Sequence, residues 1–245
     1  MYRLPAWAAS LSSTVLAAES TRHGGISPPP YDSLNLGLYT DDHPFHVAEN
    51  RRRFCKELGF RAEQLAGARQ VHGADVLEVV TDGQWDGYDA FVCRRPGLFI
   101  SISVADCVPV LLVDPVAGII GAAHAGWKGT QASITRKTLQ AMQVLGAEPA
   151  RTWAYVGTCI DVNNYEVGSA VADAFSPDYL RTGHSPGKYL LDLQRANRDQ
   201  LLKGGLPPEQ VDCSPFSTVR NVEDHFSYRA SGGVTGRAMA VIGLL

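Results

Sequence analysis

One pattern in the middle of the chain constrains the fold more than any other. Two apolar runs, Val108 to Val113 and Gly118 to Ala123, flank the turn sequence Asp114-Pro115-Val116-Ala117. Short β-branched and apolar runs on either side of such a turn are typical of a tight β-hairpin. Cys107 stands directly before the first run and His124 directly after the second. Because a hairpin brings these two ends together, we expect Cys107 and His124 to be close neighbours.

The rest of the chain predicts a mixture of strands and helices. Alternating or β-branched apolar runs indicate strands, and apolar periodicity closed by glycine indicates helices. Besides the hairpin, we expect a strand and turn at the N-terminus, strands over 70–80, 97–104, 153–156 and 237–245, and helices over 47–58, 130–145, 166–175 and 193–203. The order is not a regular βαβ alternation, so the sequence predicts an α+β fold, with mixed sheets covered by flanking helices, as one domain over residues 1–245.

Composition narrows the functional classes. The chain has 245 residues, 45% of them hydrophobic, and a net charge of −3, which argues against nucleic acid or a membrane surface as partner. Five cysteines at irregular spacing favour free thiols in a reducing, cytoplasmic setting. Polar residues interrupt the apolar N-terminal segment, so we interpret it as folded chain rather than a signal peptide. Small molecules are the expected partners, and the oligomeric state is left open.

Cys107 and His124 have two chemical interpretations. In one, Cys107 is a thiolate nucleophile and His124 its base. In the other, both bind a metal ion together with a third ligand such as His72, in the sequence Gln-Val-His-Gly. Two imidazoles and one thiolate give zinc three protein ligands and an open position, and the same donors also bind copper. A buried structural cysteine beside an unrelated histidine remains the alternative to both.

The residues after His124 suggest an anion site. Small residues surround the histidine, and Lys128 lies in the turn Gly-Trp-Lys-Gly-Thr just before the predicted helix at 130–145. A helix N-terminus beside a lysine can hold an anion. A glycine-rich strand-to-helix turn without a ligand explains the same pattern equally well.

An ordered set of motifs along the chain resembles the YfiH family, also called the multicopper polyphenol oxidase or laccase-domain family. The motifs are Thr21-Arg22-His23-Gly24-Gly25-Ile26-Ser27, Ser33-Leu34-Asn35-Leu36-Gly37, Gln70-Val71-His72-Gly73, Ala105-Asp106-Cys107-Val108-Pro109-Val110, His124-Ala125-Gly126-Trp127-Lys128-Gly129-Thr130, Tyr165-Glu166-Val167-Gly168, Phe226-Ser227-Tyr228-Arg229 and Thr235-Gly236-Arg237. Each motif is weak alone, but the ordered set covers nearly the whole chain and is specific.

The resemblance implies a fold related to certain cysteine hydrolases and deamidases, with His72, Cys107 and His124 as metal ligands and catalytic residues. It implies a zinc-dependent, or copper-dependent, purine nucleoside phosphorylase that also deaminates adenosine and cleaves methylthioadenosine. Copper-dependent phenol oxidation and hydrolysis of wrongly built peptidoglycan precursors are the alternatives. Candidate substrate-binding residues are Arg22, Asn35, Lys128, Tyr228 and Arg229, the three cations for phosphate and Tyr228 for the base.

Three features of the sequence limit these implications. Lys128 stands where the family commonly has arginine, and a lysine lacks the two-pronged guanidinium. The chain has seven histidines and no HxH pair, which disfavours a multicopper centre. The HxE…PCxxC signature of zinc nucleobase deaminases is also absent, so a proton shuttle would have to be another group, such as Asp106 or Glu166. A metal-stabilised protein without catalysis would instead need a closed site with a fourth ligand, which the motifs do not supply.

Overall fold

The computed structural model describes residues 1–245 and contains two six-stranded sheets. The first, here the terminal sheet, has the order β1 (Tyr2–Arg3), β2 (Val15–Ser20), β15 (Ala238–Leu244), β7 (Phe99–Val104), β3 (Leu65–Arg69) and β5 (Gly83–Asp86). The second, the hairpin sheet, has the order β14 (Val211–Cys213), β10 (Trp153–Val156), β8 (Val108–Asp114), β9 (Ile119–Ala125), β6 (Ala90–Cys93) and β4 (Val76–Glu78). Both sheets combine parallel and antiparallel pairs, so the predicted mixed sheets are confirmed.

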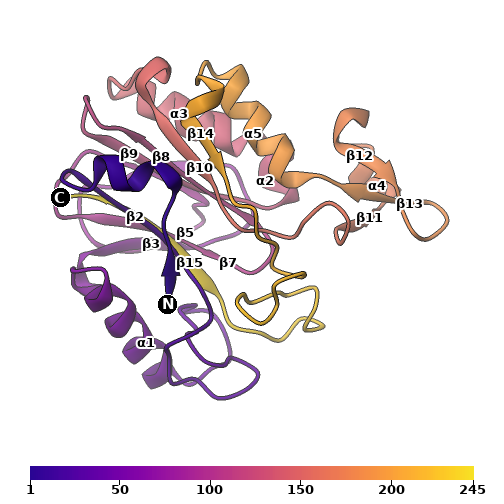
Figure 1. Ribbon diagram of the computed structural model, residues 1–245, viewed down its shortest axis with the longest axis horizontal. Coiled ribbons are helices and arrows are strands. Elements are labelled where there is room, and N and C mark those ends of the chain that lie inside the picture. Colours follow the sequence, from indigo (N-terminus) through magenta and orange to yellow (C-terminus); the bar gives the residue numbers. More distant parts are fainter.

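The two sheets form the middle layers of the molecule, with helices outside them (Figure 1). α3 (Ile134–Val144) and α5 (Leu193–Lys203) cover the outer face of the hairpin sheet, and α1 (Pro44–Glu57) packs against the terminal sheet. A small antiparallel sheet of β11 (Glu166–Gly168), β13 (Lys188–Leu191) and β12 (Leu180–Thr182) projects to one side with α4 (Ser169–Ala172). Short 3-10 helices lie at Ala6–Leu11, Ala62–Gln64, Pro149–Arg151, Pro177–Tyr179 and Pro208–Gln210. None of the helices combines the length and the apolarity that crossing a membrane would need.

Strand alternation explains why the helices are needed on the outside. Leu111 of β8 and Ile120 of β9 point into the core between the two sheets, where they meet Ile102 of β7. Their neighbours Val110 and Leu112 point the other way, into a second core under α3 and α5. Because successive side chains alternate across a strand, these apolar runs bury both faces and require a layer on each side.

Several predicted elements are confirmed. The hairpin forms with β8 and β9 antiparallel, and the helix predicted at 193–203 is α5. The strands predicted at 97–104, 153–156 and 237–245 are β7, β10 and β15, and the helix predicted at 47–58 is α1. Gly59, which follows α1, has φ +87°, the left-handed conformation that suits a glycine after a helix end.

Three predicted elements are wrong in part. The helix predicted over 130–145 begins earlier and is divided into α2 (Trp127–Gln131) and α3, because Ser133 lies at φ +61°. The strand predicted over 70–80 is a loop followed by the short β4. The helix predicted over 166–175 is β11 followed by one helical turn, because Glu166 to Gly168 pair with β13.

Candidate active site

The hairpin positions two of the three predicted ligands. β9 extends through Ala125, so His124 lies within the strand, opposite Pro109 of β8. Cys107 immediately precedes β8, at the same end of the hairpin. Both strands are central in their sheet, and a central strand holds its side chains on a rigid support.

His72 comes from a loop between β3 and β4. Its backbone is left-handed, with φ +60°, a conformation that costs a non-glycine residue energy and requires support from its surroundings. The buried carboxylate of Asp89 supplies this support, because it accepts the backbone N–H groups of Val71, His72 and Gly73 at 3.0, 2.9 and 2.7 Å. His72 is therefore fixed by its backbone.

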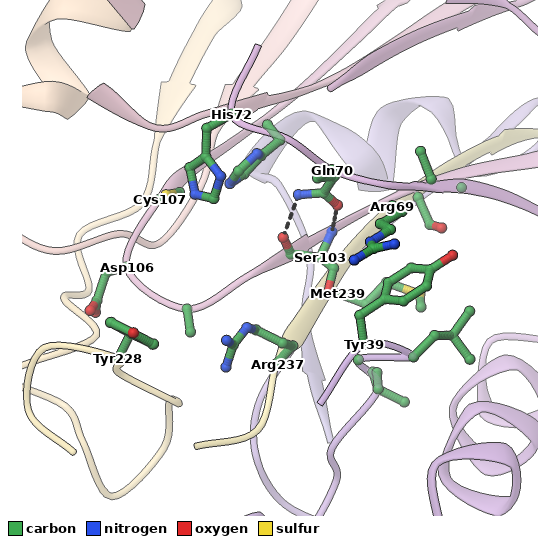
Figure 2. A pocket seen from close by; sticks show the side chains of 18 of the residues that line it. Tyr39, Arg69, Gln70, His72, Ser103, Asp106, Cys107, Tyr228, Arg237 and Met239 are labelled. Carbon is green, nitrogen blue, oxygen red and sulfur yellow. Dashed lines mark hydrogen bonds between the residues drawn. The ribbon is translucent and has the colours of Figure 1, made fainter. Parts of the chain in front are cut away.

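Gln70 anchors the start of the same loop to the terminal sheet. Its side-chain amide donates to the carbonyl oxygen of Ser103 at 2.8 Å and accepts the N–H of Ser103 at 2.8 Å. The side chain thus makes the pair of hydrogen bonds that a neighbouring strand would make, while the backbone is free to turn away. Figure 2 shows this pair between the two ends of the cavity.

The three predicted ligands come together in a single cluster. One ligand atom from each of His72, Cys107 and His124 lies within 4.8 Å of the others, and the two imidazole rings are 4.7 Å apart between centroids. Asp89 joins the loop to the hairpin, since its carboxylate also contacts His124 Nδ1 at 2.7 Å. A carboxylate on one ring nitrogen fixes the ring and leaves Nε2 for a metal ion, the usual arrangement of metal-binding histidines.

The backbone beside the cluster leaves room for it. A Cβ at Gly126 would lie 3.0 Å from Cδ2 of His72 and 3.1 Å from Sγ of Cys107. Gly126 has an ordinary extended backbone, with φ −71° and ψ 175°, so the glycine is required by space and not by conformation. The donor set and this space fit one metal ion.

Electrostatics favours ionised forms in the cluster. Burial raises the pKa of Asp89, but hydrogen bonds from His124, Gly73 and Val71 outweigh it and hold the pKa below its usual value. Burial also raises the pKa of Cys107, but the charge of His124 and hydrogen bonds from both histidines lower it to about 6. For His124 burial lowers the pKa, while the charge of Cys107 and the hydrogen bond to Asp89 raise it to about 9. Without a metal ion these shifts favour a thiolate beside an imidazolium. A metal ion would bind the thiolate and displace the proton from Nε2 of His124.

The cluster opens into a cavity of about 750 Å³. In Figure 2, His72 and Cys107 lie at one end of this cavity and Tyr39 and Arg69 at the other. Four arginines and a single carboxylate line it: Arg51, Arg69, Arg229, Arg237 and Asp106. The cavity is therefore positively charged, although the whole chain carries a net charge of −3.

Asp106 holds the cavity wall near the cluster. Its carboxylate accepts hydrogen bonds from Thr218 Oγ1 and from the backbone N–H of Arg229, the latter at 2.7 Å. The Arg229 guanidinium donates to the carbonyl oxygen of Glu166 and lies over the Tyr165 ring. Tyr228, 52% exposed, lines the same wall. Of the predicted substrate-binding residues, Tyr228 and Arg229 thus border the cavity.

The other three predicted substrate-binding residues lie outside the cavity lining. The guanidinium of Arg22 is engaged by Asp32 and the carbonyl oxygen of Val222. Asn35 is fully buried, and its side-chain oxygen accepts the N–H groups of Gly37 and Arg237. Lys128 is exposed, with its Nζ 5.6 Å from the centre of the Trp127 ring. Glu166, one of the two candidate proton shuttles, also lies outside the cavity lining. Its carboxylate accepts hydrogen bonds from the backbone N–H groups of His184 and Ser185.

Sequence reasoning missed Asp89, Arg69 and Arg237 as parts of the site. Asp89 precedes β6 without a motif around it, and its role depends on a loop that reaches it only in the folded chain. Arg237 belongs to the motif Thr235-Gly236-Arg237, and that motif is the signal in the sequence that points to it. Arg69 is the exposed last residue of β3, and its place in the cavity depends on contacts far away in sequence.

The His-Cys-His cluster, held by a buried carboxylate and open to a basic cavity, has the donor set of a metal site that a small molecule can reach. The chain belongs to the family described as multi-copper polyphenol oxidoreductase laccase, whose profile matches residues 16–245. The resemblance drawn from the motifs is therefore confirmed.

Known relatives can be aligned with this chain along almost its whole length. A purine nucleoside phosphorylase of Deinococcus radiodurans is 46% identical over 93% of this chain and 88% of its own length. The crystal structure of a Bacillus licheniformis hypothetical protein, YfiH, has a TM-score of 0.91 at 32% identity, covering 96% of this chain and 94% of that chain. The structure of YlmD from Geobacillus stearothermophilus has a TM-score of 0.90 at 35% identity, covering 94% and 92%, and that YlmD is named a purine nucleoside phosphorylase.

Proposed function

We propose that residues 1–245 form one catalytic domain, a zinc-dependent purine nucleoside phosphorylase. The observation that carries this proposal is the His72, Cys107 and His124 cluster at one end of a cavity whose charged lining is mostly arginine. The names of the relatives support the same reaction. A cavity of about 750 Å³ falls within the range of roughly 300–1,000 Å³ that small-molecule sites occupy.

The three ligands fit zinc in an open site. Two imidazoles and one thiolate provide three protein donors, and no fourth His, Cys, Asp or Glu joins the cluster. A structural zinc site would be closed by a fourth ligand. When bound, zinc would act as a Lewis acid that stabilises negative charge developing on the substrate.

The residues of the chain would bind and orient the substrate. In phosphorolysis a phosphate oxygen forms a bond to C1′ of the ribose while the bond from C1′ to the base nitrogen breaks, and the base leaves with the bonding electrons. Cations that hold phosphate bring it to the ribose and lower its repulsion from the electron-rich leaving base. The exposed ring of Tyr228 offers a face for stacking on a purine, because aromatic side chains bind planar bases well.

Deamination of adenosine and cleavage of methylthioadenosine are finer parts of the proposal. Both substrates carry adenine on a ribose ring and differ at the 5′ carbon, where methylthioadenosine has a methylthio group instead of the hydroxyl, so they would use the same cavity. In deamination, water adds to C6 of adenine, a proton is transferred to the amino group, and ammonia leaves. Asp106 is better situated for this transfer than Glu166, because Asp106 borders the cavity.

The same cluster also favours a second candidate, a cysteine hydrolase. Cys107, His124 and Asp89 form a nucleophile, a base and an orienting carboxylate in the order that such enzymes use. This arrangement keeps hydrolysis of an amide, as in a wrongly built peptidoglycan precursor, as the alternative. Copper-dependent phenol oxidation is the less well supported candidate, because a multicopper centre needs several metal sites and the structure contains one three-ligand cluster.

The test follows the products of adenosine with and without phosphate, using protein freed of metal by a chelator and then reloaded with zinc. We expect ribose 1-phosphate and adenine only when phosphate and zinc are both present. Alkylation of Cys107 should be slowed by bound zinc, since a coordinated thiolate is a weaker nucleophile. Full activity of the metal-free protein, abolished by alkylation, would show that Cys107 is the nucleophile and would refute the zinc proposal.

A further inference from the structure

Three arginines in the cavity have no acidic partner. Arg51 of α1, Arg69 of β3 and Arg237 before β15 all line the cavity, and none forms a salt bridge, whereas Arg52 and Arg53, the neighbours of Arg51, both pair with Glu49. The single carboxylate of the lining, Asp106, already accepts hydrogen bonds from Thr218 and Arg229. The positive charge at this part of the cavity is therefore not neutralised by the protein.

A short segment, residues 36–39, lies beside all three arginines. Arg51 donates from its NH1 to the carbonyl oxygen of Leu36 at 2.9 Å. The side chain of Arg237 packs against Gly37, where a Cβ would lie 2.7 Å from its Cγ. The guanidinium carbon of Arg69 is 5.9 Å from the centre of the Tyr39 ring. All three side chains therefore lie along this segment, with Arg69 beside Tyr39 and the guanidinium of Arg237 turned toward Tyr228, its carbon 5.7 Å from the centre of that ring.

The guanidinium groups also keep unused hydrogen-bond donors. Arg51 uses NH1 on Leu36, and Arg237 uses NH1 on the carbonyl oxygens of Thr235 and Gly236. The side chain of Arg69 makes no hydrogen bond within the protein, and Figure 2 shows the guanidinium groups of Arg69 and Arg237 directed into the cavity. Burial lowers the pKa of Arg51 and of Arg237 below the usual value, because nearby acidic groups offset only part of the loss of water. Both charges therefore lack full compensation. An anion would supply that compensation.

We propose that Arg51, Arg69 and Arg237 form a subsite for a phosphate dianion in the part of the cavity between Tyr39 and Tyr228. The planar fork of a guanidinium matches two phosphate oxygens, and partly desolvated charge-assisted hydrogen bonds are the strong ones. This subsite takes over the role that the sequence suggested for Arg22 and Lys128. Its use in the reaction rests on the proposed phosphorylase function, but its affinity for phosphate does not.

Two sources can supply this dianion, and the experiment distinguishes them. One is inorganic phosphate, the second substrate of phosphorolysis. The other is the phosphate ester of a nucleotide. If inorganic phosphate is the source, phosphate and adenosine bind the protein together and adenosine monophosphate binds no more tightly than adenosine. If the ester is the source, adenosine monophosphate binds at least tenfold more tightly than adenosine and competes with phosphate.

The test measures binding of inorganic phosphate, adenosine and adenosine monophosphate by calorimetry on zinc-loaded protein. The variants are Arg69→Gln, Arg237→Gln and Arg237→Lys, and Arg136→Gln is the matched control because Arg136 is an exposed arginine of α3 outside the cavity. We expect Arg69→Gln and Arg237→Gln each to weaken binding of the dianion at least tenfold. Arg237→Lys should recover part of that loss, and Arg136→Gln should bind as the wild type does.

Two outcomes would overturn the subsite. Either the wild type shows no binding of inorganic phosphate and also binds adenosine monophosphate no more tightly than adenosine, or Arg69→Gln and Arg237→Gln bind the dianion as well as Arg136→Gln does. Arg69 is exposed at the end of its strand, so its loss leaves the fold intact and the comparison is valid even if Arg237→Gln is unstable. Phosphate binding that depends on these arginines, in a protein that does not cleave nucleosides, would refute the phosphorylase and leave the subsite standing.

Discussion

At the residue scale, Asp89 connects two of the three predicted metal ligands, although no motif surrounds it in the sequence. One buried carboxylate accepts three backbone N–H groups of the His72 loop and contacts the ring of His124. Cys107 and His124 could be related from sequence because a hairpin is a local structure. The contribution of Asp89 could not, because it depends on where a distant loop lies after folding.

Gly126 provides a residue-scale prediction. In Gly126→Ala the new methyl group would lie 3.0 and 3.1 Å from atoms of His72 and Cys107, so the ligands must move apart. We expect zinc affinity to fall at least tenfold, similar to the loss when outer contacts of a metal site are removed. Competition with a chromophoric chelator measures the affinity.

Gly168→Ala is the matched control for this change. Gly168 also precedes a short helix with an extended backbone, φ −81° and ψ 168°, and its Cβ would have space. The control should keep its zinc affinity. Equal affinities of Gly126→Ala and the wild type would mean that the cluster does not hold the metal.

At the scale of elements, sequence patterns correctly predicted the helices and strands that are determined by residues close together in the sequence. The hairpin and α5 matched because their patterns and end signals agree with their packing. The prediction for residues 70–75 was wrong. Their alternating pattern suggests a strand, but the Gln70 side chain, and not a strand backbone, makes the hydrogen bonds to the backbone of Ser103. The helix predicted over 130–145 failed at Ser133, where a left-handed residue lets α3 turn onto the hairpin sheet.

The break at Ser133 leads to an element-scale prediction. Ser133 has φ +61° and no side-chain capping hydrogen bond, so its side chain costs energy there without a compensating contact. Ser133→Gly should raise the free energy of unfolding by about 1 kcal/mol, since glycine adopts this conformation without strain. Denaturation in urea measures the change, and Ser133→Ala should give no such gain. A destabilised Ser133→Gly would show that the serine side chain is needed at the break.

At the scale of the whole molecule, Glu19 links the two sheets. It is a buried residue of β2 in the terminal sheet, and its carboxylate accepts hydrogen bonds from Tyr155 of β10 and from Thr158 just after it, on the side of the hairpin sheet. Burial raises the pKa of Glu19 to about 7, although these hydrogen bonds oppose the rise. The folded protein therefore keeps a proton on Glu19 at pH values where the unfolded chain has lost it.

This link predicts how stability depends on pH. Between about pH 4.5 and 7 the unfolded chain releases the Glu19 proton and the folded protein retains it, so the contribution of Glu19 to stability falls as the pH rises. The wild type should lose up to about 3 kcal/mol relative to Glu19→Gln across that range. Unfolding measured at several pH values gives the difference, and parallel curves for the two proteins would contradict the shift.

X-ray absorption at the zinc edge of the metal-loaded wild type tests the central claim, a catalytic zinc ion in an open site, most directly. If His72, Cys107 and His124 hold the ion, the spectrum will contain one sulfur and two imidazole rings, with the remaining coordination from solvent. A spectrum without sulfur, or with four protein ligands, would contradict the account.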